Sequence, residues 1–119
     1  MIKRKNEHRV DVGENMFGGS GAISFERIIE SPEELYGKGR VFSVVTLEPG
    51  CELGYHTHSG DGEYYYIISG SADYNDNGSP CVLNAGDSAF CPDGEGHSVK
   101  NSGSVPLVFI ALIIFKSNF

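Results

Sequence analysis

Two histidines and a glutamate lie close together in the middle of the chain, with a spacing that suits metal binding. His56 and His58 are one residue apart, and Glu63 comes five residues after the second histidine. In a strand, residues i and i+2 share a face, so both imidazoles can point to one place. A tight reversal over residues 59–62 would form a hairpin that returns Glu63 beside His58. Imidazole nitrogens and a carboxylate oxygen are common ligands of divalent transition metals.

The elements that must position these residues are short strands. Sixteen glycines and five prolines in 119 residues favour frequent turns. We expect strands over residues 22–29, 40–47, 63–68, 71–74, 81–83, 88–91, 97–101 and 105–115, with one helical turn at 31–35. Strands separated by turns every 8–12 residues or so are typical of a β-sandwich or small barrel. The sequence therefore predicts an all-β fold.

Some residues are interpreted as purely structural. The glycine-rich stretch over residues 13–21 lacks the lysine of a phosphate-binding loop and is interpreted as a flexible connector. Asp61 and Asp87 fall in predicted turns, where aspartate bonds to nearby backbone. His8 lies in a polar N-terminal stretch and is interpreted as a surface residue.

Two spaced patterns resemble the two motifs of the cupin superfamily. The first is Gly50-x5-His56-x-His58-x4-Glu63-x6-Gly70, and the second is Gly86-x5-Pro92-x-Gly94-x2-His97-x3-Asn101. Every fixed position of both motifs is filled. On this basis the chain is identified as a single cupin domain over residues 1–119. The resemblance implies an N-terminal arm or edge segment (1–21) and a barrel (40–115) that holds motif one (50–70) and motif two (86–101).

The resemblance implies a jelly-roll barrel, also called a double-stranded β-helix, with a metal ion inside. The ligands it implies are His56, His58, Glu63 and His97. Three imidazoles and one carboxylate leave open positions on a six-coordinate ion, which suits Fe, Mn, Ni or Co. Zn accepts the same set as a tetrahedral site, but then without a position for substrate.

Strand alternation gives an outline of the pocket. If Glu63 points inward, so do Tyr65 and Ile67, while Tyr64 and Tyr66 point outward. Tyr65 is then a candidate hydroxyl donor near the metal, or a tyrosine packed in the core.

The pocket is expected to be mainly apolar. Arg40 and Lys100 are the basic residues that could point inward, and they do not suggest a clamp for an anion. A strongly anionic substrate is therefore disfavoured.

Two functions are compatible with these features. The first is a metal-dependent small-molecule enzyme, similar to cupin dioxygenases or isomerases, in which the ion acts as Lewis acid or redox centre. The alternative is a non-catalytic module that binds a small-molecule ligand in the barrel. The motifs specify a site and do not choose between these reactions.

Charge and cysteine content limit the partners. A net charge of −7 without a basic stripe argues against nucleic acid. The longest apolar run, residues 107–115, is too short to cross a membrane as a helix. Three cysteines make no paired framework, which favours reduced thiols and a cytoplasmic protein.

A homodimer is expected from the resemblance, since small single-barrel cupins commonly pair. The apolar residues of the first predicted strand and its end could add this strand to a partner's sheet. These residues are Ile23, Phe25, Ile28 and Ile29.

Overall fold

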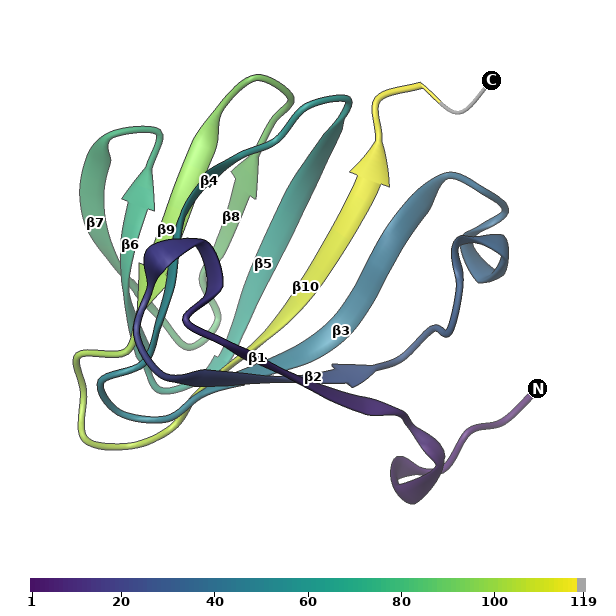
Figure 1. Cartoon of the computed structure of the whole chain (residues 1–119), viewed down its shortest axis with the longest axis horizontal. Coiled ribbons are helices and arrows are strands. Elements are labelled where there is room, and N and C mark those ends of the chain that lie inside the picture. Colours follow the sequence, from purple (N-terminus) through teal and green to yellow (C-terminus); the bar gives the residue numbers. More distant parts are fainter. Residues whose placement is uncertain (118–119) are drawn as a thin grey trace.

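A computed structural model describes residues 1–117, and these form two antiparallel sheets (Figure 1). The six-stranded sheet has the order β1 (Val10–Glu14), β2 (Ala22–Arg27), β3 (Gly39–Leu47), β10 (Leu107–Phe115), β5 (Asp61–Ser69) and β8 (Ser88–Cys91). The four-stranded sheet has the order β4 (Glu52–Thr57), β9 (Gly96–Lys100), β6 (Ser71–Asp76) and β7 (Ser79–Asn84). Three single-turn 3-10 helices, Lys5–Glu7, Met16–Gly18 and Pro32–Leu35, complete the described elements. The predicted all-β fold is confirmed.

Strand alternation holds along β5, the strand that carries Glu63. Glu63, Tyr65 and Ile67 are buried, whereas Tyr64 and Tyr66 are about half exposed. The inward side chains of β5 lie on the same face of the sheet as those of β3 and β10. These two strands supply Val45, Leu47, Leu107 and Phe109, all at most 1% exposed. The predicted inward and outward faces of β5 are therefore confirmed.

The hairpin predicted between His58 and Glu63 is wrong. β4 pairs with β9, and β5 pairs with β10 and β8, so these consecutive strands belong to opposite sheets. The backbone of His58 bonds instead to the turn before β9, through Glu95 O at 2.9 Å and Gly94 N at 2.8 Å. Residues 58–60 thus cross from one sheet to the other, and the two sheets approach at this crossing.

The segment between β1 and β2 is packed, and its prediction as a flexible connector is wrong. Its 3-10 turn lies against β4 in the opposite sheet, and Glu52 N bonds to Ser20 O at 2.8 Å. A Cβ added to Gly54 would lie 2.1 Å from the carbonyl oxygen of Phe17. Glycine is required at this position because two backbones meet there without space for a side chain.

The first predicted strand lies inside the sheet, so it cannot pair with a second chain. β2 is bonded to β1 on one side and to β3 on the other. Ile23 is fully buried in the core. The predicted dimer contact through the edge of this strand is therefore wrong, because the N-terminal β1 covers that edge.

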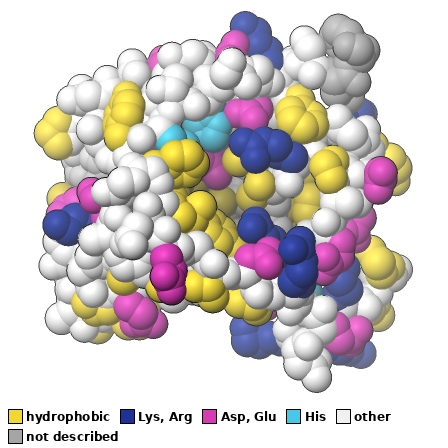
Figure 2. All heavy atoms as spheres, viewed as in Figure 1, with side chains coloured by type: hydrophobic (Ala, Val, Ile, Leu, Met, Phe, Trp, Pro, Cys, Tyr) yellow, Lys and Arg dark blue, Asp and Glu magenta, His cyan; other side chains and the backbone are white. Residues whose placement is uncertain are grey.

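One face of the molecule is hollowed between the sheets. Figure 2 shows this hollow with histidine side chains (cyan) at its rim and basic side chains (dark blue) beside it. Among residues 1–117, no helix is long and apolar enough to cross a membrane.

Candidate metal centre

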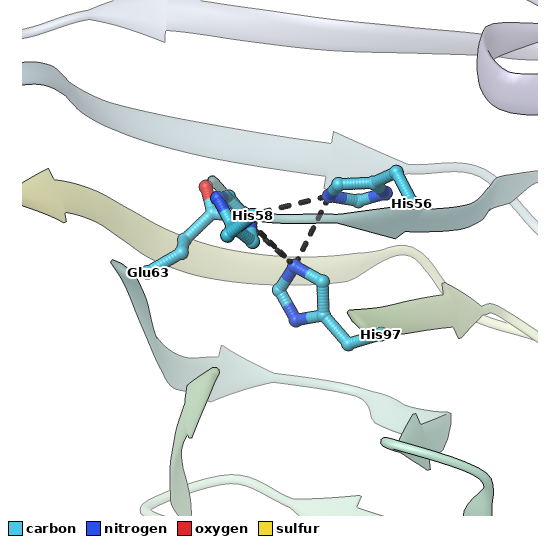
Figure 3. A group of neighbouring side chains, drawn as sticks. All are labelled: His56, His58, Glu63 and His97. Carbon is cyan, nitrogen blue, oxygen red and sulfur yellow. Dashed lines mark hydrogen bonds and ion pairs between the residues drawn. The ribbon is translucent and has the colours of Figure 1, made fainter. Parts of the chain in front are cut away.

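Four side chains from both sheets meet at the end of this hollow (Figure 3). His56 on β4 is paired in register with His97 on β9, and His58 directly follows β4. Glu63 reaches the same point from β5 of the six-stranded sheet. The sheet pairing places two histidines side by side, and the crossing after β4 brings the third histidine toward the glutamate.

The donor atoms of these residues are close enough to share one ion. Nε2 of His97 lies 3.1 Å from Nε2 of His56, Nε2 of His58 and Oε1 of Glu63. Glu63 Oε1 is 3.3 Å from His58 Nε2 and 3.9 Å from His56 Nε2. Ligands at right angles around an ion, each about 2.1 Å away, are about 3 Å apart. The observed separations fit that requirement.

The second nitrogen of each histidine is held by a hydrogen bond. His56 Nδ1 donates to the carbonyl oxygen of Gly54 at 2.8 Å, and His58 Nδ1 lies 2.7 Å from Oδ1 of Asp61. His97 Nδ1 is 2.7 Å from the hydroxyl of Tyr74. Such bonds fix the ring orientation and direct Nε2 toward a metal.

The protonation that these bonds require leaves excess lone pairs in the centre. A carbonyl or carboxylate oxygen accepts a hydrogen bond, so neutral His56 and His58 carry their protons on Nδ1. Their Nε2 atoms then face the carboxylate of Glu63 as acceptors. Acceptors that converge in a buried place need positive charge among them, either a proton or a metal ion. The donor set therefore fits a divalent cation.

The pKa values of the centre reflect the same pressure. Burial opposes ionisation of Glu63, but a proton on a facing histidine Nε2 is donated in a hydrogen bond to the carboxylate, and this interaction holds the pKa of Glu63 well below the usual range. The hydrogen bond to Glu63 raises the pKa of His58 against the effect of burial. Burial lowers the pKa of His97, which is fully enclosed. A carboxylate that stays ionised and a buried neutral imidazole are suitable metal ligands.

Tyrosine and cysteine near the centre stay protonated. Burial raises the pKa of Tyr65 and of Tyr74 well above the usual range. The Tyr65 ring stacks on His97 with centroids 4.9 Å apart, and it packs on Phe109 at 4.3 Å. Burial also raises the pKa of the Cys91 thiol to about 11, which does not favour a thiolate ligand.

A cavity of about 190 Å³ opens from the centre. This volume corresponds to about six water molecules, so it suits a small ligand. His56, His58 and Glu63 line one part of it, and Val45, Phe109 and other apolar side chains line much of the rest. Phe17 stacks on His56 at 4.4 Å and closes one side.

Two arginines also line this cavity, so the expectation that the pocket carries no pair of basic side chains is wrong. Arg40 lies there, as the sequence allowed, while Lys100 is exposed on β9 outside it. Arg27 was not foreseen. Alternation from Ile23 through Phe25 along β2 would have placed Arg27 on the inward face.

Two further residues of the centre were not found from the sequence. Asp61 begins β5 and is 6% exposed, and it bonds to His58 instead of only to a turn. Alternation backward from Glu63 would have placed Asp61 on the inward face. Tyr74 shares the inward face of β6 with Ala72, and both are buried.

Comparison with known proteins follows the same lines. The sequence model of the family described as "Cupin domain" matches residues 43–114. An "Oxalate-binding protein" from Thermotoga maritima is 38% identical over 114 residues, which cover 96% of this chain and 93% of that relative. Oxalate decarboxylase OxdC from Bacillus subtilis is 38% identical over 81 residues, which cover 64% of this chain but 20% of that protein.

Solved structures agree with the fold. The crystal structure of a protein described as a predicted oxalate decarboxylase from Thermotoga maritima has a TM-score of 0.90 at 37% identity, covering 97% of this chain and 99% of that one. A Klebsiella pneumoniae protein with a double-stranded β-helix domain has a TM-score of 0.70 at 27% identity, covering 99% and 92%. This chain therefore belongs to the cupin domain family.

Proposed function

We propose that the protein binds one divalent transition metal through His56, His58, Glu63 and His97 and uses it to bind a small carboxylate ligand. The observation that carries this proposal is the convergence of four donor atoms within 4.8 Å of one another at the end of a small cavity. Oxalate is the first candidate ligand, because a relative of nearly the same length is named for binding it.

The ion is Fe, Mn, Ni, Co or Zn, and its role is that of a Lewis acid toward the ligand. Four protein ligands leave two positions on a six-coordinate ion, and the cavity gives access from the side of His56, His58 and Glu63. Within this proposal the protonated hydroxyl of Tyr65, which also lines the cavity, is a hydrogen-bond donor toward the bound ligand.

Binding without turnover is favoured over catalysis by the residues of the cavity. Among the described side chains that line it, Glu63 is the only carboxylate, and it is committed to the metal centre. No other carboxylate of this lining is therefore available as a general acid or base toward a ligand. The second candidate is a metal-dependent enzyme, dioxygenase- or isomerase-like, and the partial match to a decarboxylase supports keeping it.

Calorimetric titration of untagged protein with oxalate tests the proposal. We expect binding after loading with Mn²⁺ or another ion that takes six ligands and none in metal-free protein, because the ligand must complete the ion's coordination. If the metal-loaded protein does not bind oxalate, oxalate is excluded as the ligand. If the protein binds none of the ions, the metal site is excluded. Consumption of oxalate or dioxygen in the same samples would favour the enzyme.

We also propose a homodimer, now through the outer face of the six-stranded sheet. Exposed apolar side chains gather there on three neighbouring strands: Tyr64, Tyr66 and Ile68 on β5, Phe90 on β8 and Ile114 on β10. Tyr64 and Phe90 already stack at 4.4 Å, so they present a flat surface that a second copy can cover by twofold symmetry.

Light scattering tests this dimer. The wild-type protein is expected at twice the chain mass, and Tyr66→Glu is expected to shift it to the monomer because a buried charge would oppose the contact. Val82→Glu is the matched control, since Val82 is exposed on β7 of the other sheet. A monomeric wild type at working concentration contradicts the proposal.

A cytoplasmic location without nucleic-acid or membrane partners is part of the same proposal. The acidic net charge of −7 supports it, as do three cysteines that are all free among the described residues.

A further inference from the structure

The cavity beside the metal centre carries two positive side chains that the four ligands do not explain. Arg27 comes from the end of β2, and Arg40 lies near the start of β3. Their side chains are 25% and 46% exposed, so Arg27 is partly buried and Arg40 is about half exposed. Apart from these arginines and Glu63, the described lining is histidine, tyrosine and apolar side chains.

Both guanidinium groups are held in place by hydrogen bonds to aspartate carboxylates. Arg27 Nε donates to Oδ2 of Asp11 at 2.9 Å, and its Nη1 lies 3.4 Å from the hydroxyl of Ser43. Arg40 Nε donates to Oδ2 of Asp61 at 2.9 Å. A guanidinium has five N–H donors in a planar fork, so one tethered through Nε retains donors on its terminal nitrogens. Groups fixed in this way lose little entropy when a ligand binds.

Arg40 is also linked to the metal centre through a shared carboxylate. Asp61 bonds to Arg40 with Oδ2 and to His58 with Oδ1, at 2.9 and 2.7 Å. Asp61 therefore fixes the position of Arg40 relative to the metal centre. This arrangement suits recognition of a ligand that contacts both the arginine and the metal ion.

With a metal ion bound, the charge balance of the cavity favours an anion. Arg27, Arg40 and Glu63 are the charged side chains of the described lining, and Asp11 and Asp61 pair with the two arginines. The three carboxylates outnumber the two arginines by one, and a divalent ion at the centre turns this balance positive. In a partly enclosed, largely apolar space, such charges attract an anion more strongly than they do in water.

We propose that Arg27 and Arg40 form a carboxylate-binding pair that contacts the end of the ligand remote from the metal, so that the site selects small anions with two acidic groups. This proposal rests on the proposed function. One acidic group coordinates the ion, and the other accepts charge-assisted hydrogen bonds from the pair. The volume of about 190 Å³ accommodates a short dicarboxylate such as oxalate or malonate.

Titration of Mn²⁺-loaded variants with oxalate, malonate and acetate tests this pair. We expect Arg27→Gln and Arg40→Gln each to weaken oxalate binding about tenfold or more, because hydrogen bonds to charged groups are lost. Acetate, with one carboxylate, should bind weakly to all forms, so the preference for oxalate over acetate should fall by the same factor. Arg27→Lys and Arg40→Lys should recover part of the oxalate affinity.

A matched control is available in Arg9. It pairs with the same Asp11, at 3.0 Å, and with Glu30, at 3.1 Å, but it does not line the cavity. Arg9→Gln should therefore bind oxalate as the wild type does. Mn²⁺ affinity is measured in every form, and Arg27→Gln should keep it, because Arg27 makes no described bond to a ligand residue or to Asp61.

The outcomes separate this inference from the function on which it rests. Unchanged oxalate affinity in folded, Mn²⁺-loaded Arg27→Gln and Arg40→Gln would overturn the pair and leave the metal site intact. An equal loss in Arg9→Gln would also overturn it, since a general charge effect would then suffice. A wild type that binds Mn²⁺ but neither dicarboxylate would overturn the pair together with the proposed ligand class.

Discussion

Replacing His56 and His58 together by alanine is expected to abolish stoichiometric metal binding. The wild-type protein should carry one ion per chain, because four donor atoms converge at one point. The double variant retains Glu63 and His97, and two ligands do not hold a divalent ion against exchange with solvent. Metal content of untagged protein, measured by mass spectrometry after growth with each candidate metal, gives the result directly.

The fourth histidine supplies the control for this loss. His8 lies outside the metal centre, and its Nδ1 is bonded to the carboxylate of Glu26 at 2.7 Å. His8→Ala should keep its metal. Addition of the ion should raise the melting temperature of the wild type and of His8→Ala, and leave the double variant unchanged, because binding to the folded state stabilises it. Equal metal content in the double variant would exclude these histidines as ligands.

Asp61→Asn is expected to weaken metal affinity about 10- to 100-fold, the usual effect of removing a carboxylate that supports a metal-ligating histidine. The change keeps the shape of the side chain but removes the charge that faces His58 at 2.7 Å. An amide can also turn its nitrogen toward His58 Nδ1, which disfavours the tautomer with a free Nε2. Competition of Mn²⁺ or Zn²⁺ with a chromogenic chelator measures the affinity.

Asp87→Asn is the matched control for this prediction. Both aspartates fall in predicted turns, but Asp87 is exposed and its described side-chain bond goes to the backbone nitrogen of Asn84. The same loss of one negative charge at Asp87 should leave metal affinity unchanged. If the two variants weaken binding equally, the effect of Asp61 is one of net charge and not of support for His58.

The four candidate metal ligands could be predicted from the sequence because they follow a fixed pattern. The spacing of His56, His58 and Glu63 predicts ligands that converge, and the second motif adds His97. Alternation along β5 places Tyr65 and Ile67 inside correctly, since side chains in a strand change face at every residue. These features depend on local geometry, which a single sequence records.

The sequence does not predict the strand pairing that brings these candidate ligands together. The turn signals after His58 predict a hairpin, but the two strands enter opposite sheets. Local turn signals report that the chain reverses and do not report which strand becomes the partner. That choice depends on which faces bury the most apolar surface, and here β10 fills the place between β3 and β5.

The all-β fold, three of the candidate ligands and the inward face of β5 could be predicted from the sequence, because spacing and alternation are local properties, and the resemblance of the second motif added His97. The surroundings of these candidate ligands depend on the tertiary structure. Asp61, Tyr74 and Arg27 come from β5, β6 and β2, and strand pairing and the packing of the two sheets bring them to one place. The arginines of the cavity, on which the chemical class of the proposed ligand depends, are therefore placed there by sheet packing and belong to neither motif.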